Sequence, residues 1–205
     1  VVNLLAKGSL KHVKEQLRKS PEEHLADLVS SIDYATSKDI ICNLYLEDWS
    51  NGMIHSPEYV YFLADTLKDS NLRRLMLPDT LGVLNHEQTF EFCSRMLERY
   101  PDLHIDFHAH NDYDLSTANV YASVKAGVHG VHTTVNGLGE RAGNVPISSV
   151  MGILNDHLKV EHNVDESKLT RISRLVESFS GIRVPENKPL IGENVYTQTC
   201  GVHAD

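Results

Sequence analysis

Short apolar runs alternate with longer segments of helical periodicity along most of this chain. The apolar runs are rich in leucine and β-branched residues, as buried parallel strands are, and they cover residues 1–5, 40–46, 72–77, 103–107 and 130–135. Between them, apolar residues recur at helical spacing, as at Leu25, Leu28, Val29 and Ile32. Strand and helix in alternation, with short connections, predict a parallel sheet covered by helices.

Capping residues mark where several of these helices begin. Ser20 precedes Pro21 and is followed three residues later by Glu23, which is the capping-box pattern. Asn85 is a second predicted cap, and Gly127 and Gly181 are typical helix ends. Further helices are expected to start near residues 56, 116, 146 and 167.

Two α/β architectures satisfy this pattern, a (β/α) barrel and an open doubly wound sheet. Polar residues follow the C-terminal ends of successive strands, and a barrel brings such ends to one mouth whereas an open sheet spreads them in a row. They are Glu47, Thr80, His108, His110 and Asn136. This placement favours a partial (β/α)8 TIM barrel, because 205 residues is fewer than the roughly 250 of a complete one. Since the chain begins at Val1, we expect a fragment of a longer polypeptide.

Charge and cysteine usage narrow the possible functions. The formal net charge of −9 argues against a nucleic-acid or anionic-membrane binder, and no apolar run is long enough to span a bilayer. Cys42, Cys93 and Cys200 are too few and too far apart for a disulfide framework or a cysteine zinc cluster. They fit a reducing compartment, so we expect a cytoplasmic protein. An anionic substrate would need local positive groups, a metal ion or helix N-termini.

The strongest local signal for chemistry is His108-Ala109-His110-Asn111-Asp112, after the predicted strand at 103–107. Residues two apart on a strand point to the same side, so His108 and His110 should present two imidazoles together, an arrangement that suits a divalent metal. The alternative is two polar loop residues satisfied by the backbone. The next strand leads into Asn-Gly-Leu-Gly-Glu-Arg-Ala-Gly-Asn at 136–144, whose glycines allow sharp turns and close approach, or a flexible loop.

These two motifs, in this order and spacing, resemble the isopropylmalate, homocitrate and citramalate synthase family. The segments at 45–48, 77–80 and 201–205 are also similar to family segments, and the likeness covers essentially the whole chain. It implies that the five strands are the fourth to eighth of the barrel. It also implies that residues 1–185 are the C-terminal portion of the catalytic barrel, and that residues 186–205 are a linker and the start of a following subdomain.

The resemblance implies an acetyl-CoA-dependent condensation with a 2-oxo acid, followed by thioester hydrolysis, in branched-chain amino-acid biosynthesis. A divalent metal, Zn or Mn, would be the cofactor and acetyl-CoA the co-substrate. His108 and His110 match the family's metal-binding histidines, and Asn144 matches a position assigned to the metal in some members. Glu47 and His203 match a catalytic carboxylate–imidazole pair that assists deprotonation of the acetyl group. The alternative for Glu47 is half of an exposed Glu-Asp pair.

Three further residues match substrate-binding positions of the family. Thr80 matches a hydroxyl that binds the carboxylate of the 2-oxo acid, and its alternative is a turn residue after a strand. Leu5 and Tyr45 match positions that contact the substrate's side chain in the citramalate branch. A bulky apolar pair there would narrow the pocket and favour pyruvate, as in citramalate synthase, over 2-oxoisovalerate, as in 2-isopropylmalate synthase. A single methylene is discriminated by only about 1–3 kcal/mol, so both acceptors stay open.

Other functions fit parts of this pattern. A lyase or carboxyltransferase on a related metal barrel also has two histidines after a late strand, but lacks the sequence at 136–144. A non-catalytic paralogue would lack the Arg-Asp pair of the family's first strand, which is absent from this chain, so we expect the fragment alone to be inactive. A hydrolytic metallo-barrel would carry its histidine pair on the first strand. Family members are generally homodimers, and we expect the same here.

Overall fold

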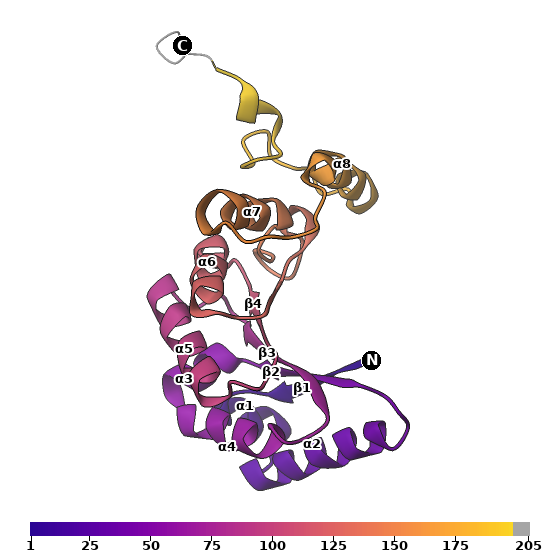
Figure 1. Cartoon of the computed structure of the whole chain (residues 1–205), viewed down its shortest axis with the longest axis vertical. Coiled ribbons are helices and arrows are strands. Elements are labelled where there is room, and N and C mark those ends of the chain that lie inside the picture. The colour runs from indigo at the N-terminus through magenta and orange to yellow at the C-terminus, as the bar shows by residue number, and fades with distance from the viewer. Residues whose placement is uncertain (199–205) are drawn as a thin grey trace.

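The computed structural model describes residues 1–198, which build a five-stranded parallel sheet with helices packed along it (Figure 1). The strands are β1 (Val2–Lys7), β2 (Cys42–Glu47), β3 (Leu72–Asp79), β4 (Ile105–Ala109) and β5 (Gly130–His132). They pair in chain order, β1-β2-β3-β4-β5, and every pair is parallel. A doubly wound sheet reverses direction at a switch point, whereas a barrel winds one way. The partial TIM barrel is therefore confirmed.

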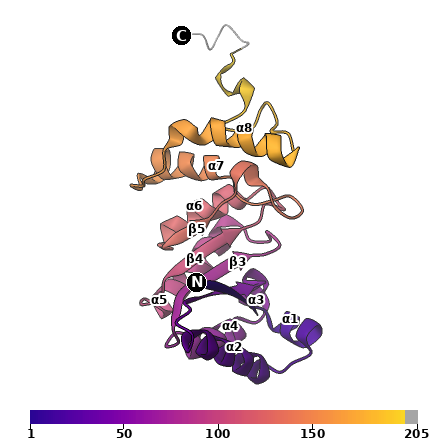
Figure 2. The same cartoon turned by 90° about the vertical axis from the view of Figure 1, so that its right-hand side faces the viewer.

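Eight α-helices are described in residues 1–198. Those that connect the strands are α1 (Leu10–His12), α2 (Pro21–Thr36), α3 (Trp49–His55), α4 (Pro57–Leu67), α5 (His86–Arg99) and α6 (Ser116–Ala126). After β5 come α7 (Ile147–Gly152) and α8 (Leu169–Ser180). Short π-helical turns at Val13–Leu17 and Ile153–Leu158 extend α1 and α7. Figure 2 shows α2 and α4 at one end of the molecule, and α6, α7 and α8 following one another toward the other end.

The helix starts expected from capping residues are present. Ser20 accepts a hydrogen bond from the Glu23 amide at 3.1 Å, and the Glu23 carboxylate accepts one from the Ser20 amide at 2.8 Å. Asn85 and Gln88 form the same reciprocal box at the start of α5. Both boxes satisfy amides that a helix leaves unpaired at its first turn.

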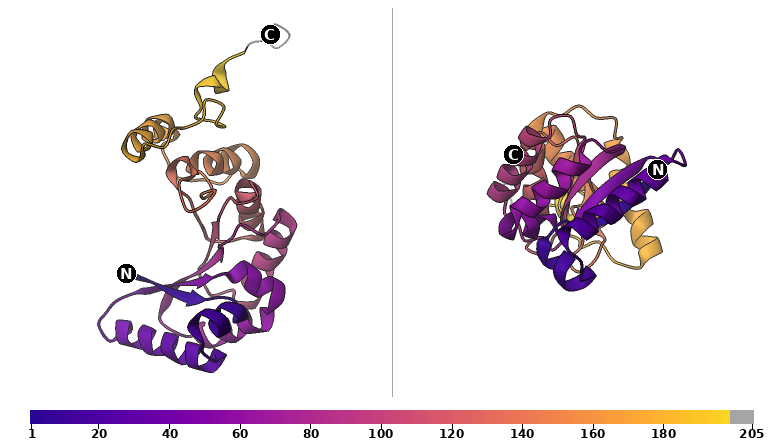
Figure 3. Two further views of the ribbon diagram at one scale, coloured as in Figure 1. Left: turned by 180° about the vertical axis from the view of Figure 1, so that it is seen from behind. Right: turned by 90° about the horizontal axis from the view of Figure 1, so that it is seen from below.

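The sheet separates an apolar side from a polar side. Leu44 and Leu46 of β2 are fully buried and pack with helix residues such as Trp49 and Leu63 in one core. The alternate positions carry polar side chains that contact one another across strands, as Asn43 donates to Asn3 at 2.8 Å. Because strand side chains alternate, this polar side is the inner face of the barrel arc. Views from behind and below show the helices along the outer side, and the segment after α8 extending away from the strands (Figure 3).

No helix within residues 1–198 combines the length and apolar character needed to cross a membrane.

Candidate functional site

Four of the predicted residues lie at or near the C-terminal edge of the sheet. Glu47 is the last residue of β2, Thr80 directly follows β3, and His108 lies inside β4. His110 follows β4 directly, and its ring lies 5.0 Å from the His108 ring, centroid to centroid, at 81°. The expectation that the two imidazoles share one side of the strand is met.

Backbone contacts fix the second histidine and the glycine-rich loop against each other. The His110 amide donates to the Asp79 carbonyl at 3.3 Å, and His110 forms an isolated antiparallel bridge with Asn144. The Asn111 amide donates to the Gly143 carbonyl at 3.0 Å. The loop at 136–144 is therefore bound to the end of β4, which brings Asn144 beside the histidines.

Two glycines are required for this close approach. A Cβ on Gly139 would lie 2.0 Å from Nδ2 of Asn144, and one on Gly143 would lie 2.0 Å from the Gly137 carbonyl oxygen. Gly143 also has a φ of +88°, which side chains rarely tolerate. The alternative of a merely flexible loop does not fit, because the glycines let the backbone fold tightly around Asn144.

Three polar side-chain atoms here are buried without a hydrogen-bond partner among the described residues. They are Nδ1 of His108, Nδ1 of His110 and Oδ1 of Asn144. Asn144 is held in place by its Nδ2, which donates to the Leu138 carbonyl at 3.0 Å. Two imidazoles and an amide oxygen form a donor set that divalent Zn or Mn accepts.

Burial keeps both imidazoles neutral. It lowers the pKa of His108 to about 4, helped by the neighbouring His110 and His132. It also lowers the pKa of His110, with a further contribution from the charge of Arg141. Neutral imidazole retains the lone pair that coordinates a metal. Within residues 1–198 no cluster of three His, Cys, Asp or Glu side chains is arranged to hold a metal, so this donor set is incomplete by itself.

Glu47 lies in a pair that the sequence did not reveal. Its Oε2 is 2.5 Å from Nζ of Lys7, the last residue of β1. Its predicted partner His203 lies outside the described residues, so the carboxylate–imidazole pair stays a prediction. The neighbouring Asp48 is only 1 % exposed, so Glu47 is not half of an exposed acidic pair.

Thr80 holds the turn after β3 against the turn after β2. Its Oγ1 accepts a hydrogen bond from the Asp48 amide at 2.8 Å, which leaves its hydroxyl proton free to donate. Its carbonyl accepts one from Nη2 of Arg141 at 2.7 Å. Both the turn role and a substrate contact are compatible with this geometry.

Leu5 and Tyr45 stand side by side on β1 and β2, as register partners. Leu5 is 66 % exposed, and the rings of Tyr45 and His108 are nearly perpendicular, with 6.3 Å between their centroids. The Tyr45 hydroxyl lies 3.0 Å from Nδ1 of His132. The structure thus places Tyr45 near the candidate metal ligand His108, with Leu5 beside Tyr45.

The residues that contact the Tyr45 hydroxyl and its partner were not predicted from the sequence. His132 Nε2 lies 3.4 Å from Oδ2 of Asp106, which also accepts from Arg74 at 2.8 Å. Burial alone would raise the pKa of Asp106, but the hydrogen bonds from His132 and Arg74 outweigh it and bring the pKa to about 2. The sequence did carry a signal for these residues: polar side chains alternate with apolar ones in β4 and β5, and Asp106 interrupts an otherwise apolar strand.

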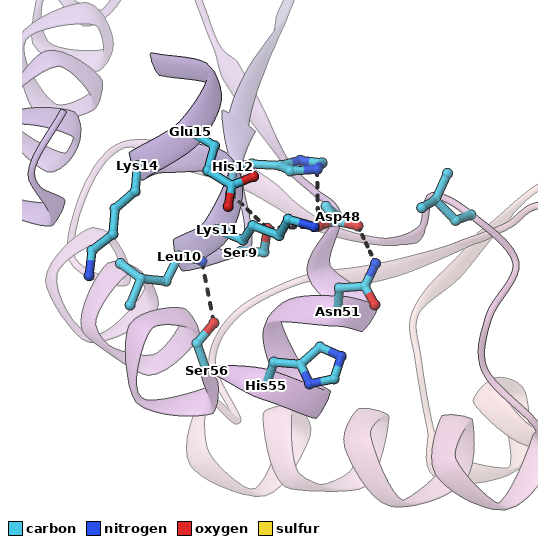
Figure 4. Close-up of a pocket in the computed structure, with 11 residues that line it drawn as sticks. Ser9, Leu10, Lys11, His12, Lys14, Glu15, Asp48, Asn51, His55 and Ser56 are labelled. Atoms are coloured by element: carbon cyan, nitrogen blue, oxygen red, sulfur yellow. Dashed lines mark hydrogen bonds and ion pairs between the residues drawn. The ribbon is translucent and has the colours of Figure 1, made fainter. Parts of the chain in front are cut away.

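A cavity of about 420 Å³ opens beside this edge (Figure 4). Asp48 lies at its wall, where it accepts hydrogen bonds from Ser9 and Asn51, each at 2.7 Å, and faces His12 Nε2 at 3.5 Å. The Asp48 amide links the cavity to Thr80. The remaining lining carries the two lysines Lys11 and Lys14 and the carboxylate of Glu15, with Leu10, His55, Ser56 and Leu81.

The sequence profile of the HMGL-like family matches residues 1–176. A protein of Methanopyrus kandleri named "Putative (R)-citramalate synthase CimA" is 36% identical over all of this chain and 40% of its own length. The homocitrate synthase of Sulfolobus acidocaldarius is 34% identical over 94% of this chain and 40% of its own length. The chain thus spans about two fifths of these relatives.

Solved structures agree on the fold. The hydroxymethylglutaryl-CoA lyase from Pseudomonas aeruginosa superposes with a TM-score of 0.77 over 89% of this chain and 64% of that chain. Its sequence identity is 23%, so the likeness concerns the barrel and not the reaction.

Proposed function

Because the chain belongs to the HMGL-like family, we propose that the protein containing it condenses acetyl-CoA with a 2-oxo acid and then hydrolyses the thioester. The observation that supports this most is the pair of neutral imidazoles, His108 and His110, at the same barrel edge as the Glu47 carboxylate. Such a site offers a metal position and a base within one mouth.

His108, His110 and Asn144 would hold the divalent metal through their unpaired buried atoms. When bound, the metal supplies a Lewis acid that draws electron density from the keto group of the oxo acid. A further ligand has to come from residues beyond the donor set described above, and the family resemblance assigns it to an Asp on the first barrel strand.

The chain's own groups would carry the proton and hold the substrates. Glu47, together with His203, removes a proton from the acetyl methyl group. The resulting carbanion carbon bonds to the keto carbon, whose oxygen gains a proton and becomes a hydroxyl. Water then cleaves the thioester and releases CoA and a new carboxylate. The free hydroxyl proton of Thr80 would donate to the carboxylate of the oxo acid.

Leu5 and Tyr45 would set the size of the acceptor. They are register partners, Tyr45 lies near His108 and its hydroxyl lies 3.0 Å from His132, so this bulky pair would narrow the space for the substituent. This supports pyruvate as the acceptor, which makes citramalate synthase the specific proposal. The alternative is 2-oxoisovalerate, as in 2-isopropylmalate synthase, and the resemblance to a homocitrate synthase adds 2-oxoglutarate to the acceptors worth testing.

The cavity in Figure 4 supports the choice of co-substrate. Its size of about 420 Å³ lies within the range of small-molecule sites. It adjoins Thr80 through Asp48, and Lys11 and Lys14 supply positive charge for the phosphates of a CoA thioester. We infer that acetyl-CoA enters from this side, although the protein as a whole is negatively charged.

The remaining assignments follow from the family resemblance. We propose that residues 1–185 form the barrel part, and that residues 186–205 lead into a further subdomain. Homodimer assembly and a cytoplasmic location are proposals of the same kind.

A lyase is the second candidate, because the barrel superposes on a hydroxymethylglutaryl-CoA lyase. One experiment separates the two. CoA thiol is measured with the intact protein, acetyl-CoA and one of pyruvate, 2-oxoisovalerate or 2-oxoglutarate, with Zn or Mn and then with chelator. Metal-dependent release that is fastest with pyruvate is expected. Cleavage of hydroxymethylglutaryl-CoA with no release from acetyl-CoA would overturn the proposal in favour of the lyase.

A further inference from the structure

Lys7 has no role in the function proposed above, yet its ammonium group makes the closest contact to the candidate base. We propose that Lys7 is a positioning residue that orients the Glu47 carboxylate at the barrel mouth. The inference rests on the proposed function, because it concerns the base of that reaction.

The positions of Lys7 and Glu47 on neighbouring strands bring their side chains into contact. Lys7 and Glu47 end neighbouring strands and are register partners, with Nζ 2.5 Å from Oε2. Their side chains are 17% and 25% exposed. The exposed pair of Lys19 and Asp27, at 42% and 54%, provides a contrast in the same chain. Partial shielding makes an ion pair more directional and less sensitive to salt.

The backbone of Lys7 is fixed by two buried side chains. Its amide donates to Nε2 of His24 at 3.4 Å, and its carbonyl accepts from the hydroxyl of Tyr59 at 3.2 Å. His24 Nδ1 and the Tyr59 hydroxyl are 2.7 Å apart. One tautomer of His24, with the proton on Nδ1, satisfies all three hydrogen bonds as a closed ring. Both side chains are almost completely buried, at 4% and 3% exposed.

Burial also keeps His24 and Tyr59 in the protonation states that these three hydrogen bonds require. It lowers the pKa of His24 and raises the pKa of Tyr59, so the imidazole stays neutral and the phenol keeps its proton. His24 of α2 and Tyr59 of α4 therefore hold the C-terminal end of β1 in place. A lysine serving only solubility would not need such support.

The strand ends themselves cannot move apart or slide. The Gly8 amide donates to the Glu47 carbonyl at 2.6 Å, and a Cβ on Gly8 would lie 2.5 Å from the Leu46 carbonyl oxygen. Lys7 and Glu47 thus keep a fixed spacing, and the ammonium restricts the rotation of a carboxylate that would otherwise sample several rotamers. A base that is held in its reactive orientation reacts faster than one that samples several rotamers.

The test uses steady-state kinetics of the intact protein with acetyl-CoA and its best 2-oxo acid. In Lys7→Met we expect kcat to fall about 10- to 100-fold, with KM for both substrates changed less than about twofold because no substrate contact is lost. Lys7→Arg, which keeps the charge, should recover most of kcat. Lys19→Met removes an exposed ion pair and serves as the matched control.

A double-mutant cycle separates positioning from general damage. In the Glu47→Gln background, Lys7→Met should cause no further loss, because the group it positions is gone. If Lys7→Met fails to fold, Tyr59→Phe, which removes only the hydroxyl bonded to the Lys7 carbonyl, should still lower kcat without changing KM. Wild-type kcat in a folded Lys7→Met protein, or full additivity in the cycle, would overturn the inference alone. Absence of acetyl-CoA turnover in the wild type would overturn the proposed function and the inference together.

Discussion

Arg141 grips Asp112 with two parallel hydrogen bonds, Nε to Oδ1 at 2.7 Å and Nη2 to Oδ2 at 2.9 Å. Nη2 also donates to the Thr80 carbonyl at 2.7 Å. A single guanidinium therefore joins the segments that follow β3, β4 and β5. The hydrogen bonds from Arg141 lower the pKa of Asp112, so both partners stay charged. Arg141 of the glycine-rich loop thus links three loops at the C-terminal edge of the sheet.

Arg141→Lys should loosen this junction, because an ammonium group cannot form the two parallel bonds. We expect metal affinity and turnover to fall about tenfold, while the free energy of unfolding changes by no more than about 1 kcal/mol. Metal titration calorimetry, kinetics and denaturant unfolding measure the three quantities. Arg99→Lys is the matched control, since Arg99 makes the same two-point contact with Asp65 on the helical surface. Equal effects of both substitutions would contradict the account.

His110→Ala should abolish metal binding and turnover together, because it removes one of the two imidazoles of the candidate donor set. The metal content of the purified protein and its turnover with added Zn or Mn are the measurements. His86→Ala, at the exposed start of α5, should leave both unchanged. Normal metal content in His110→Ala would remove this residue from the ligand set.

Glu47→Gln should lower turnover about 10²- to 10⁴-fold, the usual contribution of a general base. Metal content should stay normal, because Glu47 contacts Lys7 and not the imidazole pair. Glu58→Gln, at an exposed position of α4, serves as the control. Loss of metal in parallel with turnover would instead indicate that Glu47 belongs to the metal site.

Tyr45→Ala should move acceptor preference from pyruvate toward larger 2-oxo acids, because it empties the space beside His108. The ratio of kcat/KM for 2-oxoisovalerate and pyruvate should rise at least tenfold, equivalent to more than about 1.4 kcal/mol. Tyr45→Phe keeps the ring and loses only the bond to His132, so it should change this ratio much less. An unchanged ranking in Tyr45→Ala would exclude Tyr45 from the pocket.

Stability should fall as the pH drops below about 6.5, in part through His24. Burial lowers the folded-state pKa of His24 beneath the ordinary 6.5, so the unfolded chain binds the proton more tightly. The stabilisation from neutral His24 is fully present above pH 6.5 and is lost as the pH falls through the folded-state pKa. Urea unfolding at several pH values should show that His24→Asn costs less stability at low pH than at pH 8. A pH-independent difference would contradict the buried neutral state.

Much of the fold was predictable because buried parallel strands have a local signature. Leu44 and Leu46 lie in such a run, and Ser20 and Asn85 announce their helices by capping chemistry. Helix α3 was not predictable, since it starts at Asp48 in a left-handed conformation without a side-chain cap. It is held instead by packing, as a Cβ on Gly52 would lie 2.1 Å from the Gly8 carbonyl oxygen.

The candidate site likewise contains residues that the sequence predicts and residues that it does not. His108 and His110 were predictable because their spacing on one strand fixes their common direction. Lys7 and His132 were not, because each acquires its meaning from a partner on another strand, Glu47 and Tyr45 respectively. The partner in such a cross-strand pair depends on how two strands distant in the sequence align, which the spacing of residues within one strand does not give.

The most direct test of the proposed chemistry follows the acetyl carbon itself. The intact protein is incubated with acetyl-CoA labelled with ¹³C at the methyl carbon, pyruvate and Zn or Mn, and the products are identified by NMR. The account predicts that the label appears as a methylene carbon bonded to the former keto carbon, in citramalate, only when metal is present. Label recovered solely as free acetate, or unreacted in acetyl-CoA with every 2-oxo acid, would contradict it.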